Sequence, residues 1–341
     1  MKTKYVTIIT SLLFFALFSA CGDKKSNEQQ VQVSATGFAE IDEVTAEIAT
    51  SPEDASLYAK RATLYYNKEG YDEAIADMHK AIALDSMNAP YYHRLADIYL
   101  DYFKSHLAIR TLERAVELFP ERIPTLLKLS EFQLITKMYP ESMKTIDRIL
   151  KIDPQNAEAY FMFGMNFKES GDTARAINSF QSAVELDPDL IDAWITLGKL
   201  QADQGNKIAA RYFDNAVTIA PDNPIAIHAK ADYLRDQNDL EGAIELYKKI
   251  AVIDPQYETG YYNAGLLYME LDSVEQAYQQ FDLTIKASPL HIRAYYYRGL
   301  AAEYMGNIEQ AKSDYQQALK LAPGYERAEQ ALFRLEEKET I

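Results

Sequence analysis

Prolines at regular intervals divide most of this chain into segments of nearly equal length. Successive prolines lie 34 residues apart, except for one interval of 33, and Ser86 stands where one further proline would fall. A fixed period of this size is typical of a tandem array in which each unit buries its apolar faces against its neighbours. The 341 residues are therefore expected to form one elongated array and not two globular domains. The prolines are Pro52, Pro120, Pro154, Pro188, Pro221, Pro255, Pro289 and Pro323.

Segment 157–190 shows how one unit is built. Its fourth, seventh, eighth and eleventh places carry apolar or small residues, which is the spacing of one helix face. Gly171 and Asp172 then predict a turn, and a second apolar helix ends at Pro188, because proline cannot continue it. Each unit is therefore predicted to be two helices joined by a short turn. The residues of the first face are Tyr160, Phe163, Gly164 and Phe167.

The unit closely resembles the tetratricopeptide repeat (TPR), in which apolar, small and aromatic residues and a closing proline recur at fixed places. Segment 191–223 keeps seven characteristic residues, although Gln201 departs from the usual tyrosine at the eleventh place and one residue is missing after Gly205. The resemblance implies an all-α fold, namely a right-handed α-solenoid of about eight tandem repeats with N- and C-terminal capping helices. The seven residues are Trp194, Leu197, Gly198, Ala209, Phe213, Ala216 and Pro221.

Eight repeats cover residues 55–325. Segments 38–51 and 326–341 are predicted to be the capping helices, because the terminal units of a solenoid must cover an exposed apolar face. The third repeat departs most from the pattern, and its large Ile149 is expected to push its two helices apart and to change the local curvature. The repeats are 55–88, 89–122, 123–156, 157–190, 191–223, 224–257, 258–291 and 292–325.

The first residues have the layout of a secretory signal peptide. Two lysines precede an apolar run over residues 6–18, which is too short for a comfortable transmembrane span. Small residues and Cys21, the single cysteine of the chain, follow this run and resemble the bacterial lipobox, although Phe18 stands where leucine is commoner. The alternative is an ordinary signal peptide that is cleaved near Ala20.

The resemblance to the lipobox predicts a lipoprotein signal peptide over residues 1–20, followed by acylated Cys21 and a polar, flexible tether up to residue 37. A thioether-linked diacylglycerol and an N-acyl chain would supply the two or more chains that stable anchoring requires. Gly22 occupies the place of the aspartate that marks inner-membrane retention in some bacteria. We therefore expect a lipid-anchored protein in a Gram-negative-type cell envelope, on the outer membrane and facing the periplasm.

No pattern in the sequence indicates catalysis. The five histidines lie in different repeats or on different faces, without a second His or Cys at ligand spacing, so neither a metal nor a cofactor is expected. The glycine-containing turns lie between helices and do not follow a strand, so they are not phosphate-binding loops. The net charge of −16 disfavours binding to nucleic acid. We therefore expect no enzyme activity.

In TPR proteins the first helix of each repeat lines a concave groove that binds peptides, and the resemblance implies such a groove here. A groove that faces water is normally polar, yet apolar side chains gather in two sets at the predicted groove positions. Exposed aromatic patches usually mark an interaction site. The alternative is that these side chains fill space between repeats or are covered by the protein's own termini. The first set is Phe161, Met162 and Met165, and the second is Tyr262, Leu266, Tyr296, Tyr297 and Leu300.

The charge of the groove is expected to select the ligand. The two-carboxylate clamp of the family needs lysine at the fifth place and asparagine at the ninth place of one helix, and no repeat here has both. Acidic side chains are present instead, so we expect a protein or peptide ligand that has basic residues beside apolar anchors. The acidic residues are Asp97, Glu131, Asp232 and Glu270.

The sequence thus predicts a non-catalytic scaffold for protein–protein interaction, anchored to the membrane through Cys21. Two other functions stay open. A surface-exposed receptor component for oligosaccharide or peptide uptake would use the same tyrosines as stacking platforms. A regulator of an envelope hydrolase would bind its client stoichiometrically and change its turnover.

Overall fold

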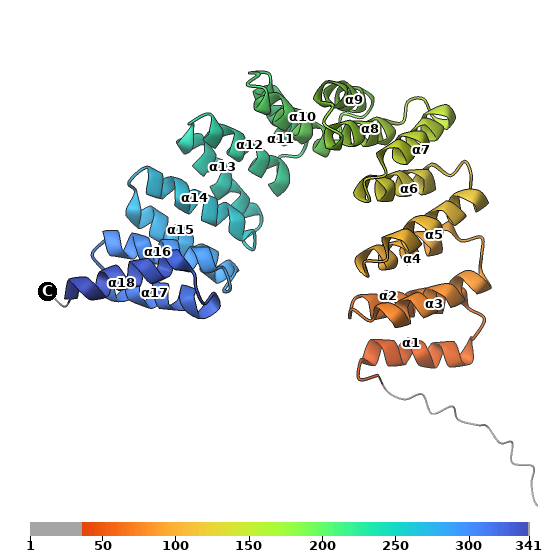
Figure 1. Cartoon of the computed structure of the whole chain (residues 1–341), viewed down its shortest axis with the longest axis horizontal. Coiled ribbons are helices and arrows are strands. Elements are labelled where there is room, and N and C mark those ends of the chain that lie inside the picture. Colours follow the sequence, from red (N-terminus) through yellow and green to blue (C-terminus); the bar gives the residue numbers. More distant parts are fainter. Residues whose placement is uncertain (1–35, 340–341) are drawn as a thin grey trace, which may run out of the picture. The chain divides into compact units, whose positions relative to one another are not determined.

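The computed structural model describes residues 36–339. Every regular element in this part of the chain is an α-helix (Figure 1), which confirms the predicted all-α fold. None of these helices is long and apolar enough to cross a membrane. The predicted signal peptide, Cys21 and most of the tether lie outside the described residues. The helices are α1 (Ala39–Thr50), α2 (Ala55–Tyr66), α3 (Tyr71–Leu84), α4 (Ala89–Asp101), α5 (Ser105–Leu118), α6 (Ile123–Ile135), α7 (Tyr139–Ile152), α8 (Ala157–Glu169), α9 (Thr173–Leu186), α10 (Ile191–Asp203), α11 (Ala209–Ile219), α12 (Pro224–Asp236), α13 (Leu240–Ile253), α14 (Glu258–Glu270), α15 (Val274–Ala287), α16 (Ile292–Tyr304), α17 (Ile308–Leu321) and α18 (Glu326–Glu339).

The chain forms two compact units. The first, up to Leu84, contains helices α1–α3, and the second, from Asp85 onward, contains α4–α18. Within the second unit, consecutive helices pack in pairs such as α8 with α9, and the second helix of each pair packs on the first helix of the next. First helices also contact one another, for example α6 with α8 and α10 with α12. The first helices carry the predicted site residues.

Aspartate and asparagine side chains determine where many of the helices begin. Their oxygen atoms accept hydrogen bonds from backbone N–H groups of the first turn, which the helix itself leaves without a partner. Asp172 accepts from the backbone nitrogen of Arg175 at 3.0 Å. Asn223 accepts from both Ile225 and Ala226. The same kind of cap begins α2, α8, α13 and α17.

Every repeat turns between its two helices through one residue in the left-handed backbone region. This residue occupies the fifteenth place of each repeat. Gly171 and Gly306 adopt the conformation without strain, whereas a residue with a Cβ is destabilised there. Phe103 is the bulkiest of these, with φ of 57° and 94% of its surface exposed. The residues are Glu69, Phe103, Lys137, Gly171, Gly205, Asn238, Asp272 and Gly306.

Close packing within four of the repeats depends on glycine at the eighth place. A Cβ on Gly164 would lie 2.6 Å from the ring of Phe180, and one on Gly198 would lie 2.8 Å from the ring of Phe213. Such distances are well inside van der Waals contact, so the aromatic ring takes the space that a side chain would need. Gly265 with Phe281 and Gly299 with Tyr315 repeat the arrangement.

The aromatic residue at the fourth place links each of several repeats to the turn before it. Trp194 donates its indole N–H to the carbonyl of Pro188 at 2.8 Å. Tyr92 donates its hydroxyl to the carbonyl of Ser86 at 3.1 Å, so the serine that replaces a proline keeps the same role as an acceptor. This bond satisfies a carbonyl at the end of a helix pair and fixes the entry of the next helix.

Buried polar side chains bond within the third repeat and between it and the fourth. Thr145 donates its hydroxyl to Oε1 of Gln133 at 2.8 Å, and Nδ2 of Asn166 on α8 donates to Oγ of Ser142 at 2.9 Å. Oδ1 of Asn166 has no hydrogen-bond partner among the described residues. Ile149 is fully buried, and α6 and α7 still pack as a pair. The predicted change in curvature stays a prediction.

The two terminal helices cover the ends of their units. α1 packs on α2, and α18 packs on α17. Phe38 begins the segment predicted to be the N-terminal capping helix, but it stands before α1 and exposes 46% of its surface. The buried faces consist of Ile41, Val44 and Ile48 in α1 and of Ala328, Ala331 and Leu335 in α18.

Candidate interaction surface

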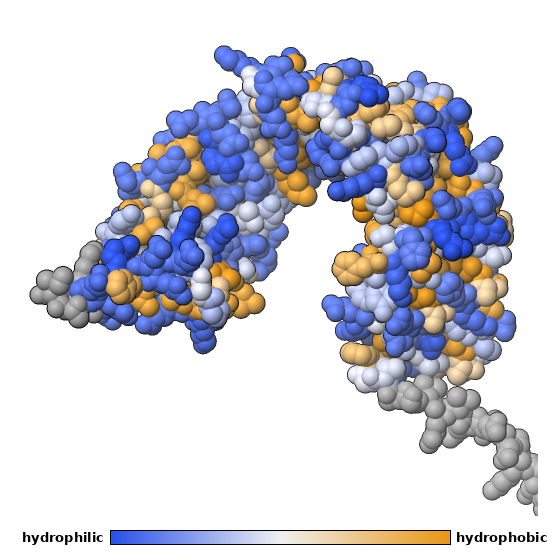
Figure 2. All heavy atoms as spheres, viewed as in Figure 1, coloured by the Kyte–Doolittle hydropathy of each residue, from blue (hydrophilic) through white to orange (hydrophobic). Residues whose placement is uncertain are grey.

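The exposed sides of the first helices in the second unit are here called the first-helix surface. It is formed by α4, α6, α8, α10, α12, α14 and α16. Figure 2 shows hydrophilic residues over most of the visible face, with apolar residues in separate patches. Three areas contain the predicted site residues. They are an apolar pocket between α6 and α8, a charged pocket between α10 and α12, and a cluster of tyrosines on α14–α18.

The apolar pocket is shallow and open, with a volume of about 460 Å³. Phe161 lines it, and the ring of Phe161 also packs on the fully buried Phe180 with ring centroids 5.5 Å apart. Met165 packs with Phe161 against the same core. Phe161 therefore both supports the core and presents apolar surface to the pocket. The complete lining is Pro124, Leu127, Lys128, Glu131, Glu158, Phe161, Met162 and Leu190.

Charged side chains surround this pocket. Nζ of Lys128 lies 2.8 Å from Oδ1 of Asp97 and 3.6 Å from Oε2 of Glu131. Burial acts to lower the pKa of Lys128, but the hydrogen bond and charge of Asp97 outweigh it and raise this pKa above its ordinary value. Asp97 is thereby engaged within the protein. Glu131 and Glu158 are exposed and leave the rim acidic.

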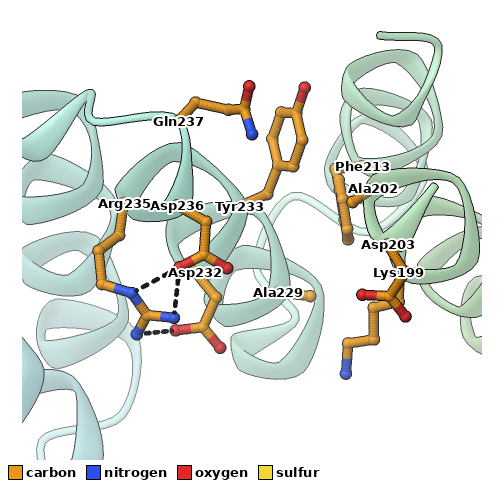
Figure 3. A pocket seen from close by; sticks show the side chains of 10 residues that line it. All are labelled: Lys199, Ala202, Asp203, Phe213, Ala229, Asp232, Tyr233, Arg235, Asp236 and Gln237. Carbon is orange, nitrogen blue, oxygen red and sulfur yellow. Dashed lines mark hydrogen bonds and ion pairs between the residues drawn. The ribbon is translucent and has the colours of Figure 1, made fainter. Parts of the chain in front are cut away.

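The charged pocket between α10 and α12 has a volume of about 230 Å³. Figure 3 shows the Arg235 guanidinium between two carboxylates, Asp232 and Asp236, each 2.9 Å away. Lys199 and Asp203 approach the pocket from α10 (Figure 3). The remaining lining residues are Ala202, Phe213, Ala229, Tyr233 and Gln237.

Asp232 is bound within the protein, contrary to the expectation that it supplies free negative charge beside the tyrosines. Besides Arg235, the hydroxyl of Tyr247 donates to its Oδ1 at 2.6 Å, and Nε2 of His228 lies 3.3 Å from its Oδ2. Burial acts to raise the pKa of Asp232, but the hydrogen bonds of His228 and Tyr247 lower it below its ordinary value. Asp232 is therefore already hydrogen-bonded and ion-paired within the protein.

The tyrosine cluster consists of Tyr262, Tyr296, Tyr297, Tyr315 and Tyr325. Tyr297 lies between the two predicted neighbours, because its ring centroid is 6.0 Å from that of Tyr262 and 5.1 Å from that of Tyr296. Tyr296 further contacts Tyr315 at 5.8 Å and Tyr325 at 5.7 Å. These edge and tilted contacts suit the charge distribution of aromatic rings. The cluster therefore joins the last two repeats to the start of α18.

Each predicted tyrosine is half-buried and packs on the core. Tyr262 contacts the fully buried Phe281, with ring centroids 6.0 Å apart, and His291, with centroids 4.7 Å apart. Burial raises the pKa of Tyr262 to about 12 and also raises the pKa of Tyr296. The rings thus fill space between repeats while part of each stays accessible. Leu266 and Leu300, one turn further along α14 and α16, are also half-buried.

Two arginines beside the tyrosine cluster were not predicted from the sequence. Arg293 lies in the first turn of α16, and Arg327 lies in the first turn of α18. Both occupy the second place of a repeat-like segment, which is one of the places that face the predicted groove. Their place in the repeat was therefore the sequence feature that could have identified them as site residues.

Comparison with known families agrees with the repeat pattern. A tetratricopeptide repeat model matches residues 89–122, a second one matches residues 292–325, and a TPR repeat model matches residues 164–205 and 231–272. The chain is a tetratricopeptide repeat protein. TPR proteins generally act as scaffolds for protein interaction. The described residues contain no group of His, Cys, Asp and Glu that could hold a metal ion.

Two human proteins are similar to this chain over part of their own longer sequences. The human protein O-mannosyl-transferase TMTC1 is 24% identical over 176 residues, which cover 50% of this chain and 20% of the relative. The human protein O-mannosyl-transferase TMTC3 is 24% identical over 253 residues, which cover 71% of this chain and 27% of the relative. This TPR chain therefore spans about a fifth to a quarter of their length.

A solved structure shows a similar fold. The Pseudomonas aeruginosa PilF structure is 17% identical in sequence, with a TM-score of 0.51, and the match covers 62% of this chain and 96% of that chain. At this level of identity the likeness concerns the TPR fold alone.

Proposed function

We propose that this TPR protein is a non-catalytic scaffold that binds a segment of a partner protein on its first-helix surface. The observation that carries the proposal is the apolar pocket between α6 and α8. Leu127, Phe161 and Met162 present apolar atoms there, although polar side chains could replace them on a surface that only faced water. A pocket of this kind accepts one or two apolar anchor residues, which supply most of the energy in many interfaces.

The partner segment carries a basic residue beside its apolar anchor. Glu131 and Glu158 remain exposed on the rim, although Lys128, which is bonded to Asp97, also lies 3.6 Å from Glu131. A lysine or arginine of the partner would complete the charge pairing on this rim. Binding at the apolar pocket should therefore weaken as salt is added, because exposed charges are screened.

Membrane attachment through acylated Cys21 completes the proposal. The support is the N-terminal sequence, with its basic start, its short apolar run and the cysteine that follows. The anchored array would face the periplasm from the outer membrane of a Gram-negative-type envelope. A Cys21→Ser variant should lose membrane association and accumulate as precursor or soluble protein, as measured by detergent partitioning. Unchanged partitioning would remove the lipoprotein part of the proposal.

A photo-crosslinking residue at Leu127 tests the scaffold in cells and identifies the captured partner. The affinity of the purified partner is then measured with Leu127→Glu and Met162→Glu variants, each expected to weaken binding more than tenfold. Val252→Glu is the matched control, because Val252 exposes 82% of its surface on α13 and lies outside the pocket. Equal affinity of all three variants would move the binding site elsewhere. A change in client turnover on binding would favour the regulator, and sensitivity of intact cells to protease would favour the surface receptor.

A further inference from the structure

Arg293 and Arg327 differ from other arginines on the same helices. Arg298 on α16 is paired with Asp314, and Arg334 on α18 is paired with Glu303. Arg293 and Arg327 are exposed, and neither forms an ion pair with any carboxylate among residues 36–339. They are therefore two cations without a carboxylate partner in a chain with a net charge of −16.

Both arginines border the tyrosine cluster. Nη1 of Arg327 donates to the hydroxyl of Tyr297 at 3.3 Å. Arg293 lies beside the hydroxyl of Tyr262. Burial raises the pKa of Tyr325, and the positive charges of Arg327 and Arg293 both oppose that rise, so both guanidinium groups lie near this third hydroxyl. The two cations and three hydroxyl groups therefore face one area.

Helix stability does not explain these positions. A cation in the first turn of a helix opposes the positive end of the helix dipole. Arg293 and Arg327 both lie in a first turn, on α16 and α18. Figure 1 shows these helices in the last part of the array. No acidic residue of the first turn of α16 offsets Arg293, whereas Glu326 and Glu329 share the first turn of α18 with Arg327.

We propose that Arg293, Arg327 and the tyrosine cluster form a second docking area, which binds an acidic segment of a partner protein with an apolar side chain between its carboxylates. The proposal rests on the proposed function as a scaffold and adds a surface of opposite charge to the apolar pocket. Guanidinium groups bind carboxylates through paired hydrogen bonds, and tyrosine hydroxyls add further donors. The exposed parts of the rings of Tyr262 and Tyr296 then cover the apolar side chain.

A protein segment fits this area better than a nucleic acid or a membrane. Nucleic acids and anionic membranes present many negative charges at once. Their recognition requires clusters of roughly four to eight lysines or arginines. The net charge of −16 would repel such a surface as a whole. A short acidic segment instead interacts mainly with charges within a Debye length of roughly 8–10 Å, because more distant charges are screened. Two unpaired arginines are sufficient at that range.

Fluorescence anisotropy of the full chain in detergent tests the proposal. The probe is a dye-labelled hexapeptide of four glutamates and two phenylalanines, and a peptide with glutamine in place of glutamate is its control. Replacing both arginines, Arg293→Gln with Arg327→Gln, should weaken binding of the acidic probe at least tenfold. The matched control, Arg110→Gln with Arg211→Gln, changes two exposed arginines elsewhere in the second unit and should leave binding intact. The melting temperature should not change in either variant.

Three outcomes would overturn the second docking area. They are equal binding of the acidic probe by both double variants, equal binding of the glutamine peptide, and arginine-dependent binding of vesicles with anionic lipid when the acidic probe does not bind. The result is separable from the scaffold proposal. Loss of partner capture at Leu127 concerns the apolar pocket, whereas the acidic probe reports only on Arg293 and Arg327.

Discussion

Arg298 and Asp314 form a bidentate ion pair inside the last repeat, with Nε to Oδ2 at 2.9 Å and Nη2 to Oδ1 at 2.6 Å. Their side chains expose only 14% and 3% of their surfaces. Arg298 occupies the seventh place, where the family pattern has leucine. The first repeat independently has the same arrangement, in which Arg61 binds Asp77 through two bonds of 2.7 Å. Both end repeats thus replace an apolar contact by a buried charge pair.

Removing one partner of this pair should be costly. Asp314→Ala leaves the buried Arg298 guanidinium with Asp282 alone, and we expect a loss of about 3–5 kcal/mol in the free energy of unfolding. Urea denaturation measures the loss. Adding Arg298→Leu restores the family residue and should recover part of the stability, since no uncompensated charge remains. A double variant that is less stable than Asp314→Ala would contradict this account.

Glycine at the eighth place should be required only opposite an aromatic ring. Gly198→Ala places a Cβ 2.8 Å from Phe213, and overpacking of this kind costs about 1–3 kcal/mol. A second change, Phe213→Leu, should recover much of that loss. Ala96 and Leu112 occupy the same two places in the second repeat, and both are fully buried. Thermal unfolding of the single and double variants gives the comparison, and additive losses would be inconsistent with the packing described.

Replacing Phe103, the left-handed turn residue of the second repeat, by glycine should increase stability. Phe103→Gly removes the Cβ strain at φ of 57° and loses little packing, because the side chain is 94% exposed. We expect a gain of about 1 kcal/mol in stability after the greater unfolded-state entropy of glycine is included. Phe103→Ala removes the ring but keeps a Cβ, so it should show no gain in a urea titration. Equal gains in both variants would attribute the effect to the ring instead.

His291 should make stability depend on pH. Its Nδ1 accepts a hydrogen bond from the backbone nitrogen of Ala294 at 3.1 Å, and burial lowers its pKa below the ordinary value of about 6.5. The unfolded chain therefore takes up the proton first. The stabilising contribution is complete above pH of about 6.5 and is lost as the pH falls through the lowered folded pKa. The nearby Glu258 and Arg293 act on this pKa in opposite directions.

Melting temperatures between pH 8 and 5 test this dependence. His291→Asn retains a capping oxygen and removes the titrating group. The variant should lose less stability than the unmodified chain over that range, while His93, whose pKa burial also lowers, still contributes in both. Identical slopes would exclude His291 as a source of the dependence.

Tyr262 should contribute to folding as well as to any binding. Tyr262→Ser removes a half-buried ring that packs on Phe281 and His291, and we expect a loss of about 1–3 kcal/mol, below the cost for a fully buried ring. Tyr262→Phe keeps the ring and should be nearly neutral in thermal unfolding. An unchanged melting temperature in the serine variant would mean that the ring does not support the fold.

The sequence was sufficient for the helices and their pairing. Gly164 and Phe180 stand at places fixed by the repeat period, and helix spacing alone puts them opposite each other. The prediction succeeded because each unit contacts only its neighbours, so local periodicity contains most of the packing information. Phe161 and Met162 were likewise recognised from their places on the first helix, and both line or support the apolar pocket.

The electrostatics of the candidate site depended on tertiary contacts. The sequence alone indicates no partner for Asp232. In the structure it forms an ion pair with Arg235, contacts His228 and accepts a hydrogen bond from Tyr247 of the next helix. Nothing in the sequence sets Arg293 apart from other surface arginines, and its place beside the hydroxyl of Tyr262 became visible only in the structure. Helix periodicity specifies which face a residue occupies, whereas the charge it presents depends on which long side chains from neighbouring repeats reach it. The conformations of those long side chains depend on tertiary packing, and no periodic pattern in the sequence indicates them.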